Sequence, residues 1–216
     1  MSVQMIQDLR PAFGEARDQG SRPTCLAFAV SDVHAVELKP FRPLSVEYLF
    51  YHAVLRMPGR DPGQAITAKA AAGALVTEGQ PVEGQWPYQH SLPMDLSMWI
   101  PPGNCQPFRR DLLVDGKSVD QVCTSLDAAR AVVLALVISE SFYTPNADGI
   151  VEQKNPDPDT GLHAVVAVGH GNSANDNYIL VRNSWGPEWG VQGHGFLERR
   201  YLERRLVLTA EIITGI

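Results

Sequence analysis

Three residues of types that could form a nucleophilic centre lie far apart in the chain: Cys25, His163 and Asn183. A cysteine attacks carbonyl carbon as the thiolate, which needs a helix N-terminus or a nearby imidazole to stabilise it. His163 could act as the general base, and Asn183 could orient its ring. A small buried cysteine is the commoner alternative for an isolated thiol, and it is the interpretation we favour for Cys105 and Cys123.

The segment that carries Cys25 is predicted to begin a buried helix. Apolar residues recur about once per helical turn in CLAFAVSDVHAVEL, and Ser21 and Thr24 are candidate caps. Cys25 then falls in the first turn, where backbone N–H groups and the helix dipole favour an anion. Further helices are predicted after Ser45, through VEYLFYHAVLR, and over residues 67–76, with loops over 79–121.

The second half of the chain has the pattern of β-strands, and it holds the other two candidates. The apolar runs AVVLALVI, HAVVAVGH, YILVRNSW and HGFLERR are separated by turn residues, which predicts a mostly antiparallel sheet. His163 enters one of these strands, whereas the other five histidines have settings typical of structural or exposed residues. The stretch ERRYLERR is predicted as a solvated, ion-paired edge. Helices followed by strands indicate an α+β fold.

Composition narrows the functional classes. The 216 residues, 44% hydrophobic and 19% charged, suffice for one globular domain over residues 1–216. A net charge of −6 gives no general attraction to nucleic acid, and the apolar runs are too short to cross a membrane. The start of the chain lacks a signal-peptide pattern, and three cysteines do not make a disulfide framework, so we expect a cytoplasmic protein. No metal-ligand spacing or phosphate-binding glycine loop occurs, so no metal and no cofactor are expected.

Several segments, in order, resemble the papain-like cysteine peptidases. DQGSRPTCLAFA (residues 18–29) is similar to the family's nucleophile segment, with Gln19 six residues before Cys25. GLHAVVAVGHG resembles its histidine strand, and YILVRNSWGPEWGVQGHGFL its Asn-Ser-Trp-Gly segment. The resemblance covers about residues 8–197. The sequence is closer to those of free-standing bacterial members than to those of lysosomal or plant members. It implies a papain-like two-lobe fold, with a helical lobe of about 1–107, a sheet-rich lobe of about 108–216 and the active-site cleft between them.

The resemblance also implies a role for each candidate. Cys25 would attack the carbonyl carbon, and His163 would take and return the proton. Asn183 would hold the imidazole, while Trp185 would shield their contact from water. Gln19, with the backbone N–H of Cys25, would form the oxyanion hole. The implied activity is hydrolysis of peptide bonds through a Cys25 thioester.

Two other functions stay open at this point: a catalytically silent module that binds peptides, and an acyl transferase or deamidase that uses the same Cys–His pair. Arg22 stands where the family usually has a half-cystine, and Leu26 where it has tryptophan after the nucleophile. Arg22 and Pro23 therefore lead us to expect a narrowed cleft that accepts few sequences. We expect a protein or peptide substrate and a dedicated regulatory partner, with no nucleic acid and no membrane. No inhibitory proregion of the usual kind is expected before residue 8.

Overall fold

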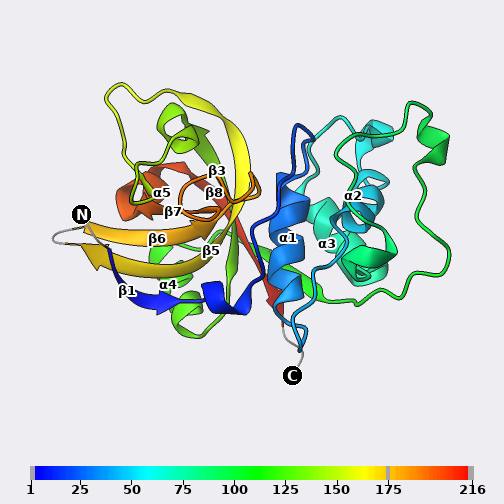
Figure 1. Ribbon diagram of the computed structural model, residues 1–216, viewed down its shortest axis with the longest axis horizontal. Coiled ribbons are helices and arrows are strands. Elements are labelled where there is room, and N and C mark those ends of the chain that lie inside the picture. The colour runs from blue at the N-terminus through cyan, green and yellow to red at the C-terminus, as the bar shows by residue number, and fades with distance from the viewer. Residues whose placement is uncertain (1–2, 174–175, 214–216) are drawn as a thin grey trace. The chain divides into compact units, whose positions relative to one another are not determined.

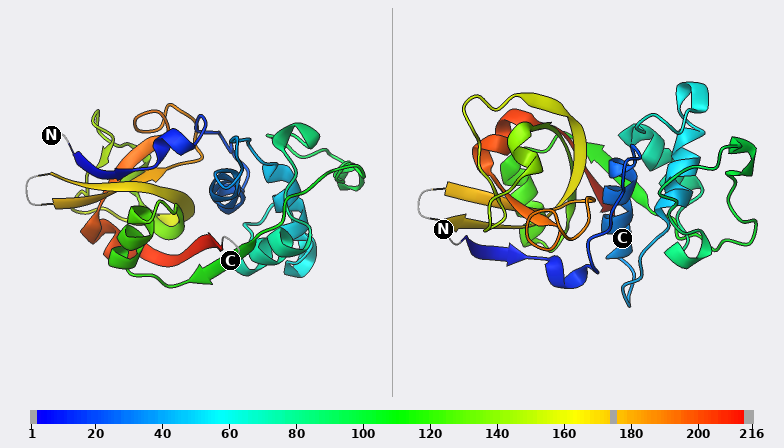
Figure 2. Two further views of the ribbon diagram at one scale, coloured as in Figure 1. Left: turned by 90° about the horizontal axis from the view of Figure 1, so that it is seen from below. Right: turned by 45° about the horizontal axis from the view of Figure 1, so that its top comes forward.

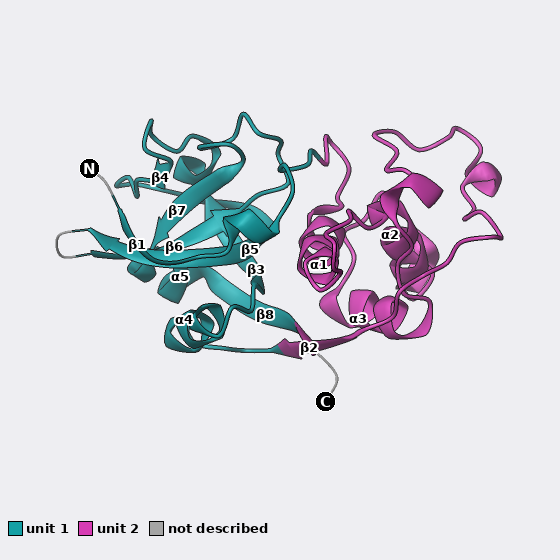
Figure 3. Ribbon diagram, turned by 60° about the horizontal axis from the view of Figure 1, so that its bottom comes forward, with its two compact units in different colours: residues 1–18, 115–211 teal, residues 19–114, 212–216 magenta. Residues whose placement is uncertain are grey.

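The computed structural model describes residues 3–173 and 176–213, and the chain forms two compact units (Figures 1 and 3). The sheet unit comprises residues 1–18 and 115–211, and the helical unit comprises 19–114 and 212–216. Helices dominate the helical unit and strands dominate the sheet unit, which confirms the predicted α+β class.

Three helices build the helical unit: α1 (Cys25–Ala35), α2 (Val46–Val54) and α3 (Ala68–Thr77). All three predictions are confirmed, and every residue of α1 from Ala27 onward is buried. The Ser45 hydroxyl accepts the Tyr48 N–H at 3.1 Å and so caps α2. Thr24 is the N-cap residue of α1, but its side chain does not cap the helix. The predicted capping role is therefore wrong.

The strands form one mostly antiparallel sheet with the order β2-β8-β3-β5-β6-β7-β4, and β1 also pairs with β5; all of these strands belong mainly to the sheet unit except β2, which belongs mainly to the helical unit. The strands are β1 (Gln4–Asp8), β2 (Asp111–Asp115), β3 (Val132–Ser139), β4 (Ile150–Val151), β5 (Asp159–Ser173), β6 (Asp176–Arg182), β7 (His194–Glu198) and β8 (Leu206–Ile213). The short β4 pairs with β7 in parallel, whereas the pairings β1–β5, β3–β5, β3–β8, β5–β6 and β6–β7 are antiparallel. The predicted strands correspond to β3, β5, β6 and β7.

Two further helices, α4 (Val119–Asp127) and α5 (Arg199–Arg205), pack against this sheet. A capping box between Ser118 and Gln121 starts α4. The first turn of this helix lies within residues 79–121, which were predicted as loops, and the rest follows them. Tyr201 and Leu202 of α5 are buried in the core, so ERRYLERR is a half-buried helix as well as an ion-paired edge. Apolar residues of both helices and of the strands form one continuous core.

The start of the chain belongs to the sheet unit, whereas the predicted helical lobe of residues 1–107 included it. The reason is β1, which pairs with β5 and which Figure 2 shows in blue along the yellow strand. A Cβ on Gly169 would lie 2.5 Å from the Gln7 carbonyl oxygen, and one on Gly171 would lie 2.4 Å from that of Gln4. Glycine at these two positions therefore allows β1 to approach. In the described part of the chain, no helix is long and apolar enough to cross a bilayer.

Candidate active site

His163 lies on β5, Asn183 directly follows the neighbouring strand β6, and the two side chains are hydrogen-bonded. His163 is a buried residue of β5, and its Nε2 lies 2.7 Å from Oδ1 of Asn183, the residue after β6. The same Oδ1 accepts the Ser184 backbone N–H at 2.8 Å, which identifies it as the amide oxygen. An oxygen without hydrogen can only accept, so Nε2 of His163 must donate. Its Nδ1 then carries the lone pair that a general base needs.

Aromatic side chains surround this imidazole. The Trp185 ring lies 4.6 Å from the His163 ring, between centroids, and the Phe142 ring lies 5.8 Å away. Tyr143 stacks on Trp185 at 5.1 Å. Burial lowers the pKa of His163 to about 4, and the bond to Asn183 offsets part of that shift. The imidazole is therefore neutral at pH 7 in this state. The Trp185 ring packs against it, while its shielding of the His163–Asn183 bond stays a prediction.

The turn that carries Asn183 is anchored by the segment just before Gln19. Arg182 donates to the carbonyl oxygens of Gly14 and Glu15, at 2.8 and 2.6 Å. The Asn183 N–H donates to the Gly193 carbonyl at 2.9 Å. Gly193 has φ of +77°, and a Cβ there would lie 2.2 Å from the Ala16 Cβ. Only glycine therefore fits this closure, which fixes the position of Asn183.

Cys25 is the first residue of α1 and lies in the helical unit. It is half-buried and forms no disulfide. The first turn of a helix presents unbonded backbone N–H groups and the positive end of the dipole, a setting that favours a thiolate. The predicted position of Cys25 is thus confirmed, while its role stays a prediction.

Gln19 lies on the loop before α1 and is buried. Its Nε2 donates to the Arg22 carbonyl at 2.8 Å, and its own carbonyl accepts the Tyr88 hydroxyl at 2.7 Å. The amide is thus held at both its side chain and its main chain. Gln19 and Cys25 belong to the helical unit, and His163 and Asn183 to the sheet unit. The association of the two pairs stays a prediction.

Arg22 does not have the place that the sequence suggested. Its guanidinium is buried and forms a bidentate ion pair with the fully buried Glu47. The Arg22 side chain therefore lies inside the helical unit and gives no support to the expected narrowed cleft, which stays a prediction. Nothing in the sequence indicates Glu47 as the partner of Arg22, because a residue 25 positions away leaves no periodic signal.

The remaining thiols and imidazoles have structural settings. Burial raises the pKa of Cys123 and of Cys105, which opposes thiolate formation. His34 is buried and hydrogen-bonded through Nδ1 to Gln80 at 2.9 Å. Within the described ranges, no group of three or more His, Cys, Asp and Glu side chains is arranged to hold a metal ion.

A sequence model of the papain family of cysteine proteases matches residues 75–209, which is more than half of the chain. The chain belongs to this family. The matched residues include His163 and Asn183, whereas Cys25 and Gln19 precede them. Sequence patterns alone had indicated the same family and the same fold.

Relatives and a solved structure show how far this papain-family likeness extends. Rat cathepsin J is 29% identical over 198 residues, which is 82% of this chain and 54% of that protein. An uncharacterised peptidase C1-like protein of Acanthamoeba polyphaga mimivirus is 32% identical over 98 residues, 44% of this chain and 30% of that protein. Xylellain, a cysteine protease from Xylella fastidiosa, has a TM-score of 0.79 at 19% identity, over 100% of this chain and 88% of that one. The chain thus has the papain-like fold. It spans about half the length of cathepsin J and about a third of the length of the mimivirus protein.

Proposed function

We propose that this chain is a cysteine peptidase that hydrolyses peptide bonds through a thioester on Cys25. The observation that carries the proposal is the His163–Asn183 bond of 2.7 Å, because it leaves Nδ1 of a neutral imidazole as the proton acceptor. Family membership and the position of Cys25 at a helix N-terminus support the same chemistry.

In the proposed reaction, Nδ1 of His163 takes the Cys25 proton, and the thiolate attacks the carbonyl carbon of the scissile bond. The tetrahedral oxyanion is stabilised by the Gln19 amide and the Cys25 backbone N–H. The C–N bond then breaks, and His163 gives its proton to the leaving amine. Water attacks the thioester with His163 as base, which releases the acid and restores the thiol. Asn183 keeps the imidazole in the tautomer and orientation that both proton transfers need.

Two measurements test this proposal. A thiol-directed epoxysuccinyl inhibitor should label wild-type protein at Cys25, and labelling should be lost in Cys25→Ala and in His163→Ala. Cys123→Ala is the matched control and should label normally. Folded wild-type protein that binds peptides but does not label would favour a silent binding module.

The products distinguish hydrolysis from the other reactions of a thioester. Mass spectrometry of a digested peptide mixture should show new carboxyl and amino termini at cleaved bonds. Peptides joined to an added amine without cleavage products would indicate an acyl transferase, and a gain of about 1 Da at glutamine would indicate a deamidase.

We also propose that the protein works in the cytoplasm with a dedicated regulatory partner. The absence of disulfides among Cys25, Cys105 and Cys123 supports a reducing compartment. Mass spectrometry of the protein from its native cells should find all three cysteines as thiols, and a disulfide would contradict this location. A dedicated regulatory partner should be recovered from those cells with both wild type and Cys25→Ala, whereas a substrate should be retained only by Cys25→Ala. Recovery of no specific protein with either would contradict the partner.

A further inference from the structure

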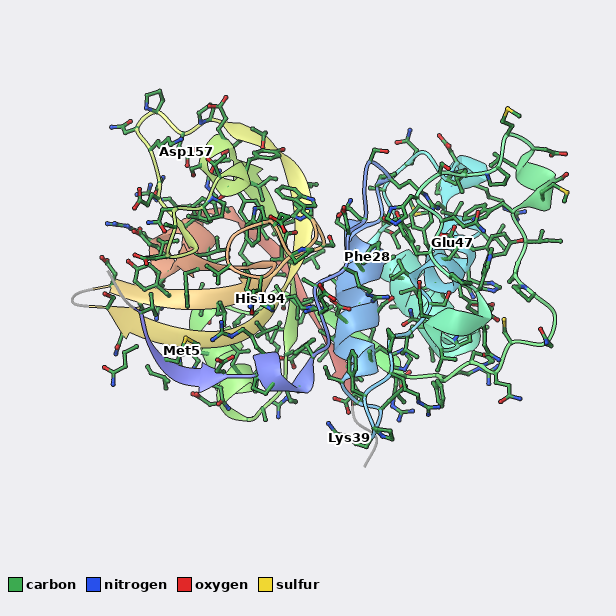
Figure 4. All side chains as sticks on the ribbon, in the orientation of Figure 1. Met5, Phe28, Lys39, Glu47, Asp157 and His194 are labelled. Carbon is green, nitrogen blue, oxygen red and sulfur yellow. The ribbon has the colours of Figure 1, made fainter. Side chains whose placement is uncertain are left out.

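A buried polar cluster of the helical unit includes Arg22, three residues before Cys25 in the chain. Arg22 Nη1 donates to Glu47 Oε2 at 2.7 Å, and Nη2 donates to Oε1 at 3.0 Å. The two side chains are 7% and 0% exposed. Such a fork-to-fork contact fixes both position and orientation, unlike a single charged hydrogen bond. Glu47 is labelled in Figure 4 and comes from the first turn of α2.

Further groups complete the environment of this ion pair. The Trp99 indole donates to Glu47 Oε1 at 2.6 Å, and the Gln89 backbone N–H donates to Oε2 at 3.0 Å. The guanidinium lies over the Phe50 ring and over the Tyr88 ring, 5.3 and 5.1 Å from their centroids. A buried carboxylate that accepts four hydrogen bonds is well compensated for its lost hydration. The ion pair therefore ties the residue-22 loop to α2 and to the 88–99 segment.

The backbone of the same arginine holds the residues proposed to act in the reaction. The Arg22 carbonyl accepts the Gln19 side-chain amide at 2.8 Å and the Thr24 N–H at 2.8 Å. Its position thus fixes the amide of Gln19 and the residue before Cys25 together. A shift of the Arg22 side chain would move this carbonyl, because both belong to one residue.

Tyr88 provides a second tie to the same loop. Its hydroxyl donates to the Gln19 carbonyl at 2.7 Å and lies 2.9 Å from the Thr24 hydroxyl. Its ring packs edge-on against Phe28 of α1, with centroids 4.8 Å apart. One hydroxyl therefore connects both ends of the loop from Gln19 to Thr24.

We propose that Arg22, Glu47 and Tyr88 are positioning residues that hold the Gln19 amide and the first turn of α1 in the geometry needed to stabilise an oxyanion. In this chain, a buried ion pair thus performs by charge and hydrogen bonds what a covalent crosslink at residue 22 would perform. The inference rests on the proposed function, since it concerns the oxyanion role given to Gln19. It adds residues that touch neither substrate nor the reacting atoms.

Two reactions of Cys25 distinguish a loss of Gln19 positioning from a general loss of structure around Cys25. Alkylation by iodoacetamide requires a reactive thiolate but forms no oxyanion, because iodide leaves as the sulfur–carbon bond forms. Hydrolysis of a fluorogenic peptide, selected as one that wild type cleaves, requires both. The readouts are the alkylation rate, kcat and KM for each variant of the full chain.

Glu47→Gln should lower kcat by at least about tenfold, because a displacement near 1 Å can cost about 100-fold. KM and the alkylation rate should stay within about twofold of wild type, since the oxyanion contact forms in the transition state. Tyr88→Phe keeps the ring and removes the hydroxyl, so we expect a smaller fall of about three- to tenfold in kcat. If circular dichroism shows that Glu47→Gln does not fold, the result for Tyr88→Phe decides whether the positioning role holds.

Glu78→Gln is the matched control, since it breaks an ion pair of similar length, 2.7 Å to Arg56, elsewhere in the helical unit. It should leave all three readouts unchanged. Unchanged kcat in Tyr88→Phe, or equal losses of hydrolysis and alkylation, would overturn the positioning role. Wild-type protein that alkylates at Cys25 but cleaves no peptide would instead refute the proposed peptidase function, and the inference would fall with it.

Discussion

His163 of β5 donates its Nε2 hydrogen to Oδ1 of Asn183, the residue after β6, and the Trp185 ring packs against the imidazole. Because Asn183 also accepts the Ser184 N–H, its amide cannot rotate without losing both bonds. The tautomer of the imidazole is therefore set by a group that is itself fixed.

Asn183→Ala is expected to lower kcat/KM by roughly 10- to 100-fold, because the imidazole loses its orientation and its acceptor. Steady-state kinetics with a cleavable peptide measure this effect. Asn177→Ala, at an exposed asparagine of the strand β6 that precedes Asn183, is the control and should behave as wild type. Equal activity of the two variants would remove Asn183 from the proposed mechanism.

Acidification should destabilise the fold between about pH 6.5 and pH 4. Burial lowers the pKa of His34, His163 and His194 from 6.5 to about 4. The unfolded chain then binds more protons in this window, so the stabilisation is complete above pH 6.5 and is lost as the pH falls through 4. Each imidazole contributes at most about 3 kcal/mol.

Urea unfolding at a series of pH values tests this expectation. His34→Gln, which lies away from the candidate site, should show a shallower decline of the unfolding free energy than wild type over the same window. The control is the range between pH 8 and 9, where these three imidazoles are almost fully neutral in both states and contribute almost no slope. An unchanged slope in His34→Gln below pH 6.5 would contradict the assignment for that residue.

Gly193→Ala should destabilise the sheet unit by about 1–3 kcal/mol, the range typical of overpacked sites. The new Cβ would lie 2.2 Å from Ala16, and the backbone has a positive φ that alanine adopts only with strain. Since the Gly193 carbonyl holds the Asn183 N–H, activity should fall as well. Gly116→Ala has open space for its Cβ and should change neither the melting temperature nor kcat.

Arg22→Met should cost about 3–5 kcal/mol of unfolding free energy, because it leaves the Glu47 carboxylate buried without its countercharge. Chemical denaturation measures the loss. Arg199→Met removes the exposed ion pair with Asp120 and should leave the midpoint nearly unchanged. A similar small effect for both variants would show that the buried ion pair contributes little to stability.

The sequence predicted the elements whose pattern is local. Helices α1 to α3 and strands β3, β5, β6 and β7 have clear apolar periodicity, and Cys25 and His163 were placed on them correctly. Helix α4 was missed although its capping box, Ser118 to Gln121, is visible in the sequence. The paired strand β1 was missed because its pattern is short and its partner, β5, lies about 160 residues away.

Partners within the candidate site were the least predictable part. The bond between His163 and Asn183 followed from a family resemblance, since neither residue type indicates the other. The burial of Arg22 against Glu47 had no signal, because an arginine in a loop and a glutamate in a helix are ordinary surface residues. Only the fold places them in one desolvated site.

Strand β5, which carries His163, is paired along both edges over much of its second half: β6 pairs residues between 166 and 173 on one edge, while on the other edge β3 pairs 159–167 and β1 follows it over 169–172. A backbone amide in such a strand can exchange its hydrogen with solvent only when several neighbours separate at once. The central amides of β5 should therefore be among the last to exchange. His163 lies three residues before this doubly paired stretch, so the strand that carries the proposed base is anchored at its slowest-opening part.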